Sequence, residues 1–429
     1  MTSSLRVILI LFAVSLFGLA VSGQAIYSRL SYLWLFLILG NYILSRVALR
    51  GLEMNRKARS IKAQVGQIFE ESFELHNNAR LPRIWVEIRD RSLLPGNKGS
   101  RVLTLIGARK TRTYISRTRL THRGSYALGP SELHSGDPFG LFPVRKNLHF
   151  EQTLTVYPRL INIFSFPSPT GLLPGGEALR RRTHQITPNA ATIREHVNGD
   201  PLSRIHWSST ARRDRLMVKE FELDPLSEVW LFLDAEERVQ AALPHDLDSD
   251  VGSVLLSKKV DNKLAPSTEE YGATITASLA RYYLQQDRSV GLMAAGKSPD
   301  ILPVDRGSRQ LGKIMEILAL LRTNGDIPYA GFVSGQARHI TRGSTIVLIT
   351  PSTNQEIALL VDQLLRLGLR PIVALINAEG FGGPTGSKEL GAAIQAFGVP
   401  QILVNEGDDL EATFRAIPFN SHIKHHLAN

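Results

Sequence analysis

Three acidic side chains follow a predicted strand, at a position where proteins often bind ligands. Asp234, Glu236 and Glu237 follow an apolar run, residues 229–233, that predicts a buried strand. Open α/β sheets bind ligands at the carboxyl ends of their strands, and Mg²⁺ prefers carboxylate oxygens. The three residues are only weak metal candidates, because Arg238 would add a positive charge beside them. The hypothesis that follows from them is a metal-dependent ligand binder or an envelope-related enzyme centred on Asp234.

A second candidate site is a basic block at residues 180–219, which contains nine Lys or Arg against three acids. This excess favours an acidic partner. The structural alternative is that Asp200 pairs with Arg204 or Arg212 and that Trp207 fills a junction between domains. Both interpretations stay open. The candidate partner-binding residues in and beside the block are Arg194, Gly199, Asp200, Arg204, Trp207, Arg212, Lys219 and Glu220.

The sequence lacks the motifs of common enzyme classes. It contains no cysteine, so thiolate nucleophiles and sulfur-ligated metal sites are excluded. Residues 380–388 are glycine-rich but lack the spacing of a phosphate-binding loop, and neither a nucleophile elbow nor a zinc-binding helix motif occurs. The prediction is therefore no enzyme and no cofactor. Nucleic acid is not expected as a partner despite the net charge of +11, because aromatic residues make up only 7%.

Two apolar runs, residues 7–22 and 26–44, predict a pair of transmembrane helices within residues 1–50. Cations closely follow the second run, so the positive-inside rule predicts a multi-pass protein of the inner (plasma) membrane with a cytoplasmic N-terminus and cytoplasmic soluble domains. The same cations could rest on lipid headgroups. The alternative is a signal peptide cleaved after Ser22. The cations are Arg46, Arg50, Arg56, Lys57, Arg59 and Lys62.

The remaining patterns divide the soluble part. Residues 51–165 contain short β-branched and aromatic runs between turn signals, which is typical of an all-β sandwich-like domain. Residues 166–227 are a junction with weak periodicity. Residues 228–429 alternate apolar strands with amphipathic helices, which predicts a mainly parallel, Rossmann-like α/β sheet covered on both faces.

Several spaced motifs resemble one bacterial family, the domain of unknown function 58. Residues 192–220 carry the strongest of them, which includes Gly199-Asp200 and Leu216-Met217-Val218-Lys219-Glu220. Earlier landmarks are Arg123-Gly124-Ser125-Tyr126, Gly129-Pro130, Asp137-Pro138-Phe139-Gly140-Leu141-Phe142 and Val156-Tyr157-Pro158-Arg159.

The resemblance implies that a von Willebrand factor type A-like domain follows the β-rich domain, in a protein often encoded beside a MoxR-type AAA+ ATPase. Type A domains often bind Mg²⁺ through Asp-x-Ser-x-Ser, and this chain has Glu236 and Arg238 at the serine positions. The expected function is a non-enzymatic adaptor or scaffold. Its expected partners are the lipid bilayer and a protein, and the resemblance suggests a MoxR-type ATPase as that protein.

Overall fold

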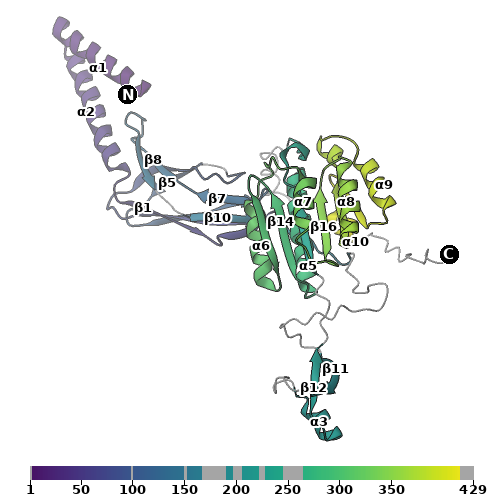
Figure 1. Cartoon of the computed structure of the whole chain (residues 1–429). Helices are drawn as coiled ribbons and strands as arrows, with labels where there is room; N and C mark the ends of the chain where they lie inside the picture. The colour runs from purple at the N-terminus through teal and green to yellow at the C-terminus, as the bar shows by residue number, and fades with distance from the viewer. Residues whose placement is uncertain are drawn as a thin grey trace. The chain divides into compact units, whose positions relative to one another are not determined.

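The computed structural model describes residues 2–97, 100–148, 152–166, 190–196, 205–221, 228–244 and 264–415. It divides the chain into two compact units. The first comprises residues 1–159 and 244–265, and the second comprises residues 160–243 and 266–429. Figure 1 shows their elements, coloured along the chain. The junction predicted at residues 166–227 thus belongs to the same unit as the α/β domain.

Two apolar helices begin the first unit. α1 (Ser3–Ser22) and α2 (Ala25–Ala48) are each long and apolar enough to cross a membrane. At 1.5 Å per residue, the 20 residues of α1 span about 30 Å, which is the thickness of a bilayer core. Few of their side chains are buried inside the protein. The predicted pair of apolar helices is confirmed, and their insertion into a membrane stays a prediction.

The first unit continues as mainly antiparallel β-sheets, which confirms the predicted β-rich domain. Its sheets have the strand orders β1-β3-β6, β2-β10-β7 and β5-β4-β8-β9, and β2 pairs with β10 in parallel. Every second residue of β3 is buried, because successive side chains of a strand point to opposite faces. The strands are β1 (Leu52–Ala58), β2 (Lys62–Gln64), β3 (Ile68–Asn77), β4 (Arg83–Asp90), β5 (Ser100–Ile106), β6 (Thr111–Arg119), β7 (Gly124–Leu128), β8 (Ser131–Ser135), β9 (Val144–Leu148) and β10 (Gln152–Tyr157).

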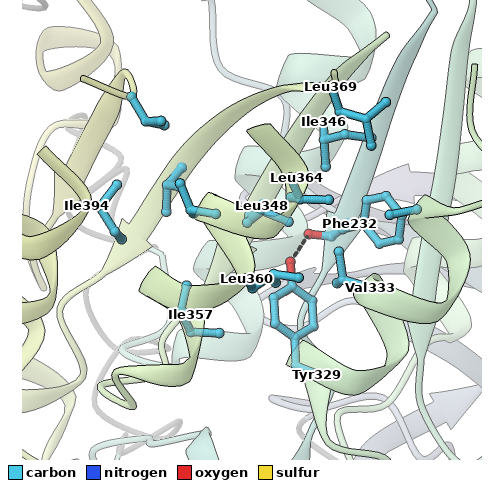
Figure 2. Close-up of a cluster of buried hydrophobic side chains, with 14 of the residues drawn as sticks. Phe232, Tyr329, Val333, Ile346, Leu348, Ile357, Leu360, Leu364, Leu369 and Ile394 are labelled. Carbon is cyan, nitrogen blue, oxygen red and sulfur yellow. Dashed lines mark hydrogen bonds between the residues drawn. The ribbon is translucent and has the colours of Figure 1, made fainter. Parts of the chain in front are cut away.

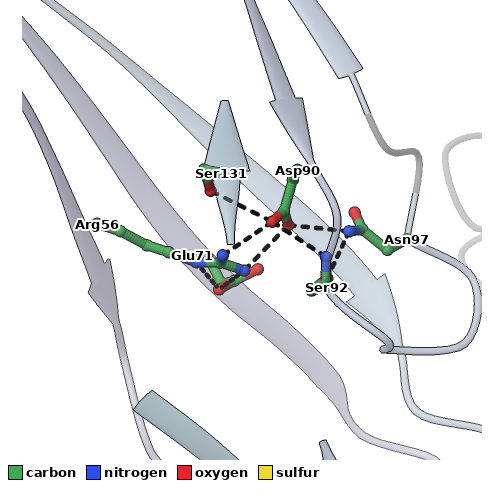
Figure 3. Close-up of polar contacts among 6 residues, drawn as sticks. All are labelled: Arg56, Glu71, Asp90, Ser92, Asn97 and Ser131. Atoms are coloured by element: carbon green, nitrogen blue, oxygen red, sulfur yellow. Dashed lines mark hydrogen bonds and ion pairs between the residues drawn. The ribbon is translucent and has the colours of Figure 1, made fainter. Parts of the chain in front are cut away.

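A buried charge cluster joins three strands of this domain (Figure 3). The Nε of Arg56 on β1 donates to Glu71 on β3 at 2.7 Å, and its Nη1 and Nη2 donate to Asp90 on β4 at 2.9 and 3.0 Å. Ser131 and Asn97 also donate to Asp90. Arg56 is fully buried. The suggestion that the cations after α2 rest on lipid headgroups is therefore wrong for Arg56, because its partners lie in the core.

The second unit contains a six-stranded sheet of order β15-β14-β13-β16-β17-β18. All its pairings are parallel except that of β14 with β15, so the predicted mainly parallel sheet is confirmed. Continuous apolar runs form the central strands because both of their faces are covered. The strands are β13 (Val229–Leu233), β14 (Val290–Ala295), β15 (Pro299–Asp305), β16 (Thr345–Thr350), β17 (Arg370–Ile376) and β18 (Gln401–Val404).

Helices cover both faces of this sheet. On one face, Phe232 and Leu348 pack in a core with side chains of α7, α8 and α9 (Figure 2). On the other, Gly272 of α5 approaches Leu233 so closely that an added Cβ would lie 3.0 Å from its side chain. The helices are α5 (Thr268–Gln285), α6 (Ser308–Leu320), α7 (Tyr329–Ala337), α8 (Glu356–Arg366), α9 (Ser387–Ala396) and α10 (Leu410–Arg415), with short 3-10 helices η2 (Glu237–Val239) and η3 (Ala378–Phe381).

Candidate functional site

Asp234 lies at the carboxyl end of β13, as the sequence predicts, and its carboxyl group is held inside the protein. It is 1% exposed. Its Oδ2 accepts a hydrogen bond from the Thr350 hydroxyl at 2.5 Å, and its Oδ1 accepts from the backbone N–H of Glu236 at 3.0 Å. Thr350 ends the neighbouring strand β16, and its Oγ1 also accepts from the Ser352 N–H at 2.9 Å. These bonds join the ends of two adjacent strands.

The electrostatics of this position favour a neutral carboxyl. Burial raises the pKa of Asp234 to about 7, and the hydrogen bonds from Thr350 and Glu236 offset only part of that rise. Desolvation penalises the charged form, and the nearby Glu236 carboxylate adds to the penalty. Near neutral pH the group therefore exchanges between a carboxylate, which only accepts hydrogen bonds, and a carboxylic acid, which can also donate one.

The other two metal candidates have different surroundings. The Glu236 side chain accepts the backbone N–H of Tyr329, at the start of α7, at 3.1 Å. Glu237 begins η2 and is exposed. Across the residues that the structure describes, no group of three or more Asp, Glu or His side chains is arranged to hold a metal ion. Metal binding at Asp234 stays a hypothesis.

The described part of the basic block forms a small hairpin, which we call the α3 hairpin (residues 190–196 and 205–221). β11 (Ala190–Glu195) pairs with β12 (Met217–Phe221), and α3 (Trp207–Arg213) precedes β12. Ile205, Met217 and Val218 are buried. The N-terminus of α3 is capped by the His206 ring, whose Nδ1 accepts the Ser209 N–H at 3.2 Å.

The α3 hairpin exposes one aromatic side chain and several cations. Trp207 is 68% exposed, and Arg212 and Arg213 on the same helix are exposed as well. Arg215 is exposed too, and it pairs with Glu195 across the hairpin at 2.9 Å. The structural alternative, in which Trp207 fills a junction between domains, stays a prediction.

The structure describes only some of the predicted partner-binding residues. Arg194 lies on β11 opposite Val218, and Lys219 and Glu220 lie on β12 opposite Ile193 and Thr192. The side chains of these three predicted residues, and all of Gly199, Asp200 and Arg204, lie outside the described residues. The pairing of Asp200 with Arg204 or Arg212 thus stays a prediction.

Sequence reasoning missed two residues that contact the Asp234 site. Thr350 follows an apolar run, and only the parallel pairing of β13 with β16 brings its hydroxyl to Asp234. Tyr329 donates its hydroxyl to the Phe232 carbonyl at 2.9 Å (Figure 2). Its helix contains two glycines, Gly331 and Gly335, which weaken the helical pattern in the sequence.

Comparison with known proteins supports the resemblance drawn from the motifs. Residues 192–245 match the family model "Protein of unknown function DUF58", which confirms that resemblance. The uncharacterized protein YeaD of Bacillus subtilis (strain 168) is 21% identical over 334 residues, which cover 76% of this chain and 77% of YeaD. The matched family segment contains the α3 hairpin from Thr192 onward, together with Asp234.

Similarities to solved structures are weak. The CARDB domain of a Pyrococcus furiosus protein has a TM-score of 0.18 and 12% identity, covering 24% of this chain and 91% of that domain. An exo β-N-acetylglucosaminidase from Vibrio harveyi has a TM-score of 0.17 and 8% identity, covering 76% of this chain and 57% of the enzyme. TM-scores this low support no statement about the fold or the function of this chain.

Proposed function

This chain carries a segment of the DUF58 family, and we propose that it is a membrane-anchored, non-enzymatic adaptor for a protein partner. In this proposal α1 and α2 cross the inner membrane, and the α/β unit follows a type A-like arrangement. The partner binds to the α3 hairpin and to one face of the type A-like α/β unit. A MoxR-type AAA+ ATPase is the first partner to test, because the family resemblance suggests it.

The exposed side chain of Trp207, on the same short helix as the exposed Arg212 and Arg213, supports this proposal. Tryptophan and arginine are enriched among the residues that dominate protein interfaces, because both combine a large apolar surface with polar groups. An exposed tryptophan contributes little to the packing of the hairpin itself, whose buried residues are Ile205, Met217 and Val218. The exposed cations of the hairpin favour an acidic surface on the partner.

Replacing Trp207 by alanine is expected to weaken partner binding by about 2 kcal/mol or more, roughly 30-fold in Kd. Arg212→Glu should also reduce binding, because it reverses one charge of the contact surface. The measurement is recovery of the ATPase from detergent extracts on the immobilised full-length chain, followed by titration of the purified pair.

Arg338→Glu is the matched control, since Arg338 is exposed at the end of α7 and the substitution makes the same change in net charge. Thermal unfolding should be nearly unchanged in all three variants, because exposed substitutions usually alter stability by about 0.5 kcal/mol or less. Full partner recovery by folded Trp207→Ala would exclude the α3 hairpin as the contact surface.

The orientation in the membrane is proposed from the distribution of cations around the two helices. Arg46 lies in the last turn of α2 and Arg50 follows it, whereas Arg29 is the only cation near the turn between α1 and α2. Excess Lys and Arg remain on the cytoplasmic side. We expect protease to digest the soluble units in inverted inner-membrane vesicles and to leave them intact in spheroplasts. Digestion in intact spheroplasts would contradict the cytoplasmic location.

A further inference from the structure

We propose that the loop between β8 and β9, residues 136–143, inserts Phe139 into the lipid–water interface of an anionic leaflet. We call this segment the β8–β9 loop. The inference rests on the proposed membrane anchoring by α1 and α2, and it adds a second membrane contact made by the β domain. The proposed ligand of the β8–β9 loop is an acidic phospholipid, contacted at its headgroup and first acyl carbons.

The β8–β9 loop contacts both apolar helices. The hydroxyl of Thr2, the N-cap of α1, donates to the carbonyl of Leu141 at 2.9 Å. The Phe142 ring packs edge-on against the Tyr42 ring of α2, with ring centroids 5.6 Å apart. If the helices cross a bilayer, this loop lies where α1 enters it.

Tyr42 marks the depth of the contact. It lies six residues before Ala48 at the end of α2, or about 9 Å along the helix axis. Arg46 donates to the Tyr42 hydroxyl from Nε and Nη2 at 3.1 and 2.7 Å, and its guanidinium also lies 5.1 Å from the centre of the ring. A tyrosine held by an arginine is typical of the interfacial belt, where the ring is half in lipid and the charge reaches the headgroups.

The shape of the β8–β9 loop exposes one aromatic side chain. Asp137 is buried, and its carboxylate accepts the backbone N–H groups of Phe139, Leu141 and Phe142 at 3.1, 3.0 and 2.6 Å. Gly140 follows with a φ of 67°, which allows the chain to turn back. Leu141 points inward, whereas Phe139 is 63% exposed at the tip. The hydrogen bonds keep the polar backbone satisfied while the phenyl ring faces outward.

Charge favours a lipid surface as the occupant. Arg6 lies one turn into α1, Arg46 lies in the last turn of α2, and Arg145 follows the loop on β9; all three are exposed. Lys and Arg near an anionic leaflet are attracted to its headgroups. An aromatic side chain at the tip, flanked by cations and adjoining the ends of two apolar helices, matches the interface of a bilayer more closely than the surface of a soluble protein.

The absence of cysteine from the sequence allows a direct test with single labels. Phe139→Cys, Phe36→Cys and Leu93→Cys are each coupled to an environment-sensitive fluorophore in the full-length chain. Phe36, on α2, is 71% exposed and reports whether the helices insert. Leu93 is 76% exposed and serves as the matched control. Leu93 follows the carboxyl end of β4. The other end of β4 lies near α2, because Arg83 donates to the Arg50 carbonyl there. The strand from Arg83 to Asp90 spans about 23 Å, so Leu93 lies far from that end.

The labelled chains are reconstituted in vesicles of phosphatidylcholine and phosphatidylglycerol that contain nitroxide lipids, with the quencher either near the headgroup or near the end of the tail. We expect the label at residue 139 to shift its emission to the blue and to lose emission to the headgroup-proximal quencher. The label at residue 36 should lose emission to the tail-end quencher, and the label at residue 93 should lose none.

The outcomes separate this inference from the proposed anchoring. Quenching at residue 36, with residue 139 as unquenched as residue 93, would overturn the inference and leave the membrane anchor intact. An unquenched label at residue 36 would overturn the anchor and with it the loop contact. Equal quenching of residues 93 and 139 would also overturn the inference, because the contact would not be specific to the β8–β9 loop.

Discussion

Replacement of Arg56 by leucine is expected to lower the free energy of unfolding of the β domain by about 3–5 kcal/mol, because breaking a buried ion pair leaves an uncompensated charge. The Arg56 guanidinium is the cation that neutralises Glu71 and Asp90 within hydrogen-bonding distance. It also lies 5.0 Å from the centre of the Phe73 ring, so leucine would lose a cation–π contact as well.

The loss of stability in Arg56→Leu should depend on pH. Burial raises the pKa of Glu71 above its ordinary value even with Arg56 beside it. Without Arg56 that pKa should rise further, since the two lowering causes, charge attraction and hydrogen bonding by Arg56, are removed. As the pH falls, Glu71 takes up a proton in the folded variant and one buried charge disappears. The difference from the wild type should therefore shrink toward acid pH.

Hydrogen exchange of the β3 and β4 amides in the full-length chain, read by mass spectrometry, measures this effect within the first unit. Arg112→Leu on β6 is the matched control, because Arg112 is exposed. In Arg112→Leu the β3 and β4 amides should be as protected from exchange as in the wild type. Equal protection in Arg56→Leu and Arg112→Leu would mean that the charge cluster does not stabilise the domain.

The second large effect is expected at Asp234. Asp234→Asn should remove a pH dependence from the free energy of unfolding of the α/β unit. The carboxyl binds its proton more tightly in the folded chain, with a pKa of about 7, than at its ordinary value of 3.8. Protonation therefore stabilises the folded state. That contribution is complete below about pH 4, declines as the pH rises toward 7, and is absent above that range. The total is about 4 kcal/mol, since each pKa unit corresponds to about 1.4 kcal/mol.

The asparagine side chain introduced by Asp234→Asn would be neutral at every pH, and its amide can still accept the Glu236 N–H and donate to the Thr350 hydroxyl. Urea unfolding of both proteins, followed by hydrogen exchange of the β13 and β16 amides, gives the difference in stability of the α/β unit at each pH. We expect Asp234→Asn to be more stable than the wild type at pH 8 and to lose that advantage near pH 4. A difference that does not change with pH would contradict the raised pKa.

The same titration tests the metal hypothesis. A bound cation favours the ionised carboxylate, so Mg²⁺ or Mn²⁺ would stabilise the wild type at pH 8 and would leave Asp234→Asn unchanged. Such a result would favour the metal-dependent alternative centred on Asp234. A carboxyl group held only by its hydrogen bonds to Thr350 and Glu236 predicts no stabilisation by either ion.

Local sequence patterns determined much of this molecule. The sequence predicts the apolar helices α1 and α2 and the apolar strands β13, β16 and β18. Each of these elements has a pattern of apolar residues within its own segment. β15 and α7 are less predictable from the sequence. β15 is a half-exposed edge strand containing two prolines, and α7 carries two glycines, so neither has a strong pattern of its own.

The contacts around the functional groups required the tertiary structure. The sequence placed Asp234 at a strand end, but its pairing with Thr350 depends on two strands 116 residues apart lying side by side. In the sequence Arg56 is one of several cations after an apolar helix, and only the approach of β3 and β4 makes it a buried counter-ion. A side chain's charge state and exposure depend on which distant segments surround it, and no single segment of the sequence contains that information.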